Sequence, residues 1–179
     1  PILIGHSMGA SVAYGMMGTA TPIKAIVAID QSPKMLNNDE WPFGYRNATR
    51  ANYRLVFHHR HVVRETLNGV PKDLQWSLDT VKEQFPFDEE NAWPLLRDHV
   101  LKDWRKNLQH TTIPTLLVTA NQSPYFNGEF ADKMVEANAS HLQHVAIDQT
   151  GHVVMAEQPA KFNQAVFNYL NSLPKIEEN

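Results

Sequence analysis

The sequence predicts an α/β fold in which a parallel sheet is covered by helices on both faces. Four short apolar runs, bounded by Gly, Pro, Asp or Asn, have the composition of buried strands: Ile2–Ile4, Ile23–Ile29, Thr115–Val118 and His144–Ile147. Continuous apolar runs of this kind fit a parallel sheet that is buried on both sides. Helical stretches separate these runs, and this alternation of strand and helix is typical of α/β proteins.

Three helices are expected to cover the sheet. The first, Met8–Met17, consists mainly of small and apolar residues and can therefore pack closely against the strands. The second, Phe130–Asn138, follows the third strand. The third, Pro159–Leu170, begins with Pro at a first helical position and repeats apolar residues on one face.

The middle of the chain predicts helices without strands. Apolar residues recur there with helical spacing in two sets, Leu74, Leu78, Val81 and Phe85, then Trp93, Leu96, Val100 and Trp104. Pro94 is placed to open the helix of the second set, and Tyr53–Leu67 is a third helical candidate. A helical insertion between two strands predicts a cap over residues 37–108, between core segments 1–36 and 109–179.

Composition excludes several classes of protein. The 179 residues include 16 Lys and Arg against 19 Asp and Glu, a net charge of −3, which lacks the basic footprint of a nucleic-acid-binding protein. No apolar run approaches the roughly 20 residues of a membrane span. The absence of Cys excludes disulfides, thiolate zinc sites and a cysteine nucleophile. The chain begins within a strand and shows no signal peptide, so the cytoplasm is the expected location.

A serine follows the first strand in the pattern G-x-S-x-G. Gly5-His6-Ser7-Met8-Gly9 lies between a predicted strand and a helix of small residues, the context in which this pattern marks a nucleophile. The sharp turn needs small neighbours, which Gly5 and Gly9 are expected to supply. The helix that starts behind Ser7 directs its N–H groups toward the hydroxyl, so the amide of Met8 is a candidate oxyanion donor.

With these features the chain resembles the α/β-hydrolase family. The resemblance implies that the four strands correspond to the last four of the family's eight. The first four strands, and the early loop that contributes a second oxyanion donor, are then expected to lie outside this sequence. The resemblance also implies that the catalytic histidine follows the last strand. The block Gly151–Leu170, which starts GHVVMAEQP, matches the family's histidine loop and final helix, and His152 is therefore the predicted general base.

The triad acid is harder to assign. Many members of the family place it after the seventh strand, where this sequence has Ser123, and serine cannot stabilise an imidazolium by charge. Asp30, which closes the run AIVAID, is the preferred candidate because some lipases of the family carry their acid after this earlier strand. Asp30 can also be a turn residue. Asp148 and Glu129 remain alternatives.

These residues predict a serine hydrolase that cleaves a carboxylic ester, lactone or thioester through an acyl-enzyme. A cofactor-free perhydrolase and a ligand-binding or signalling protein with little turnover remain alternatives. Trp93, Trp104 and His6 are tentative pocket residues, with His6 also expected to have a packing role. The expected partner is a small ester-like substrate, and the oligomeric state is left open.

A cluster of histidines, His58, His59 and His61, raises the question of a metal site. His58 and His61 would share a face of a helix. No carboxylate is placed to complete a site, and Arg54, Arg60 and Arg64 surround the cluster with positive charge. A solvated cap face is therefore the preferred interpretation, and no metal or organic cofactor is expected.

Overall fold

The computed structural model describes residues 1–58 and 63–174. Its centre is a four-stranded parallel sheet in the order β1 (Ile2–His6), β2 (Ala25–Ile29), β3 (Thr115–Ala120) and β4 (Leu142–Ile147). The predicted parallel sheet is therefore confirmed. Because all four strands run the same way, the loops that follow them gather at one edge of the sheet.

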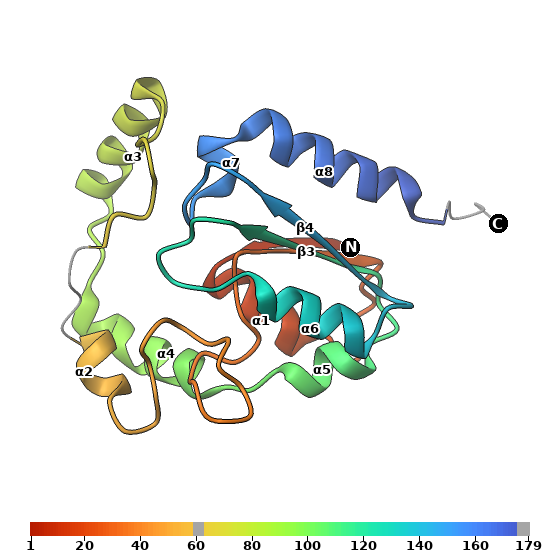
Figure 1. Ribbon diagram of the computed structural model, residues 1–179. Helices are drawn as coiled ribbons and strands as arrows, with labels where there is room; N and C mark the ends of the chain where they lie inside the picture. Colours follow the sequence, from red (N-terminus) through yellow and green to blue (C-terminus); the bar gives the residue numbers. More distant parts are fainter. Residues whose placement is uncertain (59–62, 175–179) are drawn as a thin grey trace.

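Helices cover both faces of this sheet (Figure 1). One face carries α1 (Met8–Met16), α5 (Arg105–His110) and α6 (Glu129–Ala137), and the other carries α7 (Val154–Glu157) and α8 (Pro159–Ser172). Successive side chains of a strand point to opposite faces. Ile26 and Ala28 therefore join one buried cluster, with α1 and α6, while Val27 and Ile29 join a second cluster with α8.

The insertion between β2 and β3 contains α2 (Tyr53–His58), α3 (Lys72–Gln84) and α4 (Glu89–Leu101), gathered beside one end of the sheet in Figure 1. Residues 31–52 form no helix. They are held by side-chain bonds to the backbone, such as those from Asn37 Nδ2 to the carbonyl oxygens of Tyr45 and Ala48, at 2.6 and 2.9 Å.

Three details of the insertion differ from expectation. Of the helix predicted over Tyr53–Leu67, the first six residues form α2, residues 59–62 lie outside the described residues, and residues 63–66 are not helical. Pro94 does not open its helix: α4 begins five residues earlier, where the side chain of Asp88 caps it by accepting from the amide of Asn91 at 3.0 Å. Trp104 lies beyond α4, at the start of α5, and α5 packs against α1 and α6 on the core.

The apolar stripe of α3 is exposed. The spacing of Leu74, Leu78, Val81 and Phe85 correctly predicted a helix, yet these four side chains are 38–74% exposed and no residue of α3 is buried. Periodicity indicates which residues share a face, but it does not say what that face contacts. Over residues 1–58 and 63–174, no helix combines the length and apolar character that crossing a membrane requires.

Stability should depend on the buried imidazole of His99, in the last turn of α4. This side chain is 8% exposed, and burial lowers its pKa from 6.5 to about 4. The unfolded chain therefore takes up a proton at higher pH than the folded chain, so stability is present above pH 6.5 and is lost as the pH falls toward 4. As the pH falls from 7 to 5, we expect protonation of this group in the unfolded chain to lower the free energy of unfolding by about 2 kcal/mol.

Urea unfolding of the wild type and of His99→Asn at both pH values measures this contribution. Between pH 7 and pH 5, the free energy of unfolding of the variant should fall by about 2 kcal/mol less than that of the wild type. The same substitution at His110, an exposed ring that ends α5, controls for the exchange of imidazole for amide. Equal pH dependence in the wild type and His99→Asn would contradict the assignment.

Candidate active site

The predicted site residues gather at the carboxyl edge of the sheet. The strand register pairs His6 with Ile29 and Ile29 with Val118, so the residues that follow β1, β2 and β3 are neighbours. Backbone bonds extend this order beyond the strands, from Ser7 N to the Ile29 oxygen at 3.0 Å and from Asp30 N to the Val118 oxygen at 2.7 Å. The loops that carry Ser7 and Asp30 are therefore anchored side by side.

Ser7 occupies a sharp turn between β1 and α1. Its φ of 55° and ψ of −126° lie in a region that L-residues rarely adopt, as expected for a strained nucleophile turn. A Cβ at Gly5 would lie 2.5 Å from the carbonyl oxygen of Gly9, so position 5 requires glycine. A Cβ at Gly9 would meet no atom of the described residues within 4 Å, so the expectation that Gly9 also supplies space is wrong there.

The first amide of α1 is available for a ligand. Within the described residues, the N–H of Met8 makes no hydrogen bond, whereas the amides of Ala10 and Ser11 both donate to the carbonyl of Ser7. The free N–H lies at the positive end of the helix dipole. This position suits an oxyanion formed on a carbonyl carbon attacked by Ser7.

Asp30 closes β2 with a positive φ of 47° and is 1% exposed. Its carboxylate accepts three hydrogen bonds: Oδ1 from the amide of Ala120 at 3.1 Å, and Oδ2 from Ser123 Oγ and His152 Nδ1, both at 2.7 Å. A buried carboxylate is costly unless its oxygens are bonded in this way. Of the candidate acids, Asp30 is the one that contacts the imidazole of His152.

The imidazole of His152 is held in one tautomer. The side chain is 3% exposed, and because a carboxylate only accepts, Nδ1 carries the proton and Nε2 is left as an acceptor. Nε2 is then able to take a proton from a hydroxyl. Among the hydrogen bonds of the described residues, none joins Ser7 to His152, and catalytic hydrogen bonds commonly tighten only when substrate binds.

Ser123, at the position where the resemblance would place the acid, is hydrogen-bonded to the candidate acid Asp30. Its hydroxyl donates to Asp30 Oδ2 and accepts from the amides of Tyr125 and Phe126, both at 3.3 Å. Asp30 follows β2 and Ser123 follows the adjacent strand β3, and their side chains are joined by a hydrogen bond at Asp30 Oδ2.

His6 packs beside His152 on the strand that leads to Ser7. The ring centroids are 4.4 Å apart, and His6 Nε2 donates to the carbonyl oxygen of His152 at 2.8 Å. Burial lowers the pKa of His6, and the neighbouring His152 lowers it further. A neutral His6 places no second positive charge beside an imidazolium at position 152. These contacts fit the packing role expected for His6.

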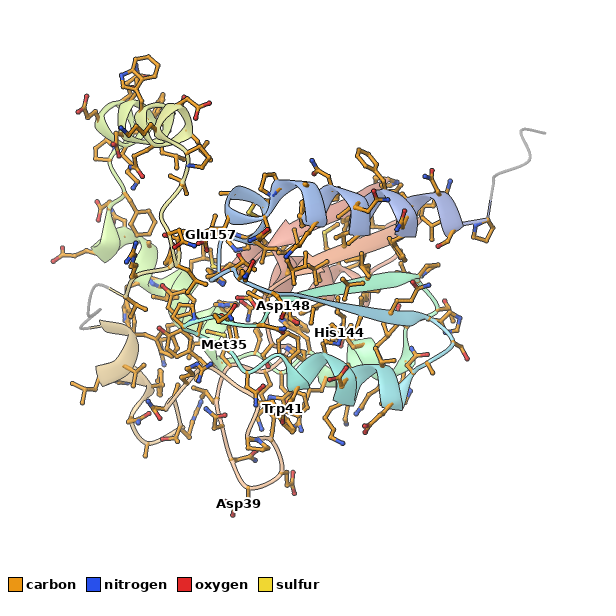
Figure 2. All side chains as sticks on the ribbon, turned by 45° about the horizontal axis from the view of Figure 1, so that its top comes forward. Met35, Asp39, Trp41, His144, Asp148 and Glu157 are labelled. Carbon is orange, nitrogen blue, oxygen red and sulfur yellow. The ribbon has the colours of Figure 1, made fainter. Side chains whose placement is uncertain are left out.

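Other candidates lie elsewhere. Asp148, which is labelled in Figure 2, accepts a hydrogen bond from the side-chain amide of Asn121. Glu129 lies at the start of α6. Trp104 donates from Nε1 to Ser11 Oγ at 3.0 Å and lies against Gly15, so its indole contacts α1. Trp93 is partly buried against the core, and its place in a substrate pocket stays a prediction.

The metal hypothesis for the histidine cluster is not tested. His59 and His61 lie outside the described residues, and the side chain of His58 is likewise not described. Among the residues that are described, no group of three or more His, Asp or Glu side chains is placed to hold a metal ion.

Two residues of the site escaped the sequence analysis. The ring of Tyr125 packs at a steep angle to that of His152, with centroids 4.7 Å apart, and the Tyr125 hydroxyl donates to Glu65 Oε1 at 2.7 Å. The carbonyl oxygen of Glu65 in turn accepts from the amide of His152 at 2.7 Å. No motif marks Glu65, because it acts largely through its backbone.

Comparison with known proteins gives one matching family model and several solved structures of the same fold. The sequence model described as "Alpha/beta hydrolase family" matches residues 1–165. An esterase (EaEST) from Exiguobacterium antarcticum superposes with a TM-score of 0.75 at 18% identity, over 94% of this chain and 66% of its own. A bromoperoxidase from Bacillus anthracis gives 0.61 at 18% identity, over 95% and 67%.

A serine hydrolase involved in carbazole degradation (CarC enzyme) gives a TM-score of 0.64 at 19% identity, over 95% of this chain and 63% of its own. The chain thus spans about two thirds of the length of these solved structures. No curated protein matches the sequence. At these identities the structural likeness shows the fold alone.

Proposed function

Because this chain belongs to the alpha/beta hydrolase family, we propose that it is a serine hydrolase that cleaves a carboxylic ester, lactone or thioester. The observation that carries the proposal is the buried bond between Asp30 Oδ2 and His152 Nδ1, at the sheet edge that also carries the strained turn of Ser7. An ordered acid and base beside a serine in such a turn are the parts that acyl transfer requires.

In the proposed reaction Ser7 Oγ attacks the carbonyl carbon while its proton passes to His152 Nε2. The Met8 amide donates to the oxyanion, and Asp30 stabilises the imidazolium. The tetrahedral intermediate then breaks its bond to the leaving group. The leaving group takes the proton from His152 and departs, and Ser7 remains acylated. Water then attacks this ester with His152 as base, which releases the acid and restores Ser7.

Two alternatives make different forecasts. A perhydrolase would pass the acyl group to hydrogen peroxide instead of water. We retain this alternative because the chain shares its fold with a bromoperoxidase. A binding or signalling protein would have the fold with little turnover. The observed contact between Asp30 and His152 supports an enzyme over this second alternative, because it supplies the acid that Ser123 cannot.

The test is labelling of the intact protein by a fluorophosphonate, which reacts only with an activated serine. We expect one adduct, on the peptide that contains Ser7, and none after heat denaturation or in Ser7→Ala. Absence of labelling in the folded wild type would contradict the proposal. Hydrolysis of short p-nitrophenyl esters, with and without added peroxide, then distinguishes the hydrolase from the perhydrolase.

A further inference from the structure

A short segment of the insertion lies directly against the loop that carries His152. This segment, residues 65–68, which we call the strap, lies between α2 and α3 in the sequence. The amide of His152 donates to the carbonyl oxygen of Glu65 at 2.7 Å, so the backbones of strap and loop are in direct contact. A Cβ at Gly151 would collide with that same carbonyl, which explains why glycine precedes the histidine.

One carboxylate joins the strap to the histidine loop a second time. Glu157, which ends α7, accepts with Oε1 from the amides of Leu67 and Asn68, at 2.7 and 3.0 Å. Its other oxygen, Oε2, accepts from the amide of Gly151 at 2.7 Å and from the hydroxyl of Thr150 at 3.4 Å. Figure 2 shows Glu157 on the side of the core that faces the insertion.

The chemistry of this contact requires an ionised carboxylate. The three backbone amides around Glu157 can only donate, and a carboxylate is the side chain that accepts at both oxygens. Glutamine has the same shape but only one accepting oxygen, so either orientation of its amide places an NH₂ against N–H groups on one side. Hydrogen bonds to a charged acceptor are also the stronger ones.

We propose that Glu157 is a positioning residue that joins the strap to the histidine loop, residues 150–152, so that the two segments move as one mechanical unit. The insertion then helps to hold His152 in place. This inference rests on the proposed function of His152 as the base. Since Glu157 does not touch the reacting atoms, it acts through the backbone of residues 150–152. The strap adds a second support to the one that Asp30 provides at Nδ1.

The first arm of the test is kinetic and compares Glu157→Gln with the wild type on p-nitrophenyl acetate, butyrate and octanoate. A misplaced imidazole should lower kcat by roughly tenfold to a hundredfold for all three esters, with KM little changed. Glu136→Gln, the same change in an exposed pair with Lys133 on α6, should leave kcat unaltered. A rise in KM, or a loss confined to the longest ester, would mean that Glu157 serves only the shape of the insertion and would overturn the proposal.

The second arm is native-state hydrogen exchange, and it does not depend on turnover. In the wild type the amides of Leu67, Asn68, Gly151 and His152 should open with one common free energy, although the two segments are more than 80 residues apart. Glu157→Gln should expose both segments together. Separate opening energies in the wild type would overturn the proposal even where Glu157→Gln does not fold. A wild type that fails to label or hydrolyse, yet shows common opening, would refute the proposed function and leave the mechanical unit supported.

Discussion

Replacing Ser7 with alanine should lower kcat/KM for p-nitrophenyl esters by about 10⁴-fold or more, to the level that binding alone can support. The substitution removes the one hydroxyl that the turn between β1 and α1 presents beside a free helix amide. Alanine at this position keeps the backbone strain and adds no volume, so the fold should survive. The measurement is the initial rate of the purified intact protein on the acetate and butyrate esters.

The matched control is Ser11→Ala, one turn further along α1. The hydroxyl of Ser11 accepts from Trp104 Nε1, so its loss should affect packing and leave most of the rate. His152→Ala should cost about as much as Ser7→Ala, and the double variant little more, because members of a triad act as a unit. If Ser7→Ala retained most of the wild-type rate, the assignment of the nucleophile would be wrong.

Replacing Asp30 with asparagine should cost about 10⁴-fold in kcat, the loss seen for the same change in a serine-protease triad. With its oxygen kept toward the Ala120 amide, the asparagine NH₂ would face His152 Nδ1 and drive the proton to Nε2, where it blocks attack by Ser7. With the amide reversed, the NH₂ would oppose the N–H of Ala120. In either orientation the charge that stabilises the imidazolium is gone.

Asp148→Asn provides the control, since Asp148 lies after β4 and is bound by Asn121 instead of His152. This variant should keep nearly the full rate. Ser123→Asp should give no gain, because the carboxylate of Asp30 already occupies the place beside His152. A small effect of Asp30→Asn together with a gain from Ser123→Asp would show that Asp30 only shapes a turn.

The buried strands of the parallel sheet and the approach of Asp30 to His152 could be foreseen from the sequence. Each buried run has a distinct composition, and residues that follow parallel strands meet at one edge, which is why Asp30 was expected within reach of His152 and lies 2.7 Å from it. The close approach at Gly5 was likewise evident from the motif.

The insertion was less predictable, for three physical reasons. Residues 31–52 are held by single side chains, such as Asn37, that bond scattered backbone groups and produce no periodic pattern. The start of α4 depends on a cap at Asp88, which outweighs the preference of Pro94 for a first turn. Contacts such as that between Glu157 and the strap join residues about 90 positions apart, and no spacing rule reports them.

The meeting of Asp30 and Ser123 at a single oxygen has an evolutionary consequence. An aspartate at position 123 with Asp30 still present would bring two carboxylates together, which raises the pKa of one of them, and serine at both positions would leave no acid. Under the proposed function, neither single change is therefore expected to improve the rate, and the loss of Asp30 alone would remove the acid. If Asp30 is the acid, as proposed, relocating it to position 123 requires a change at both positions, so we expect the identities at 30 and 123 to vary together.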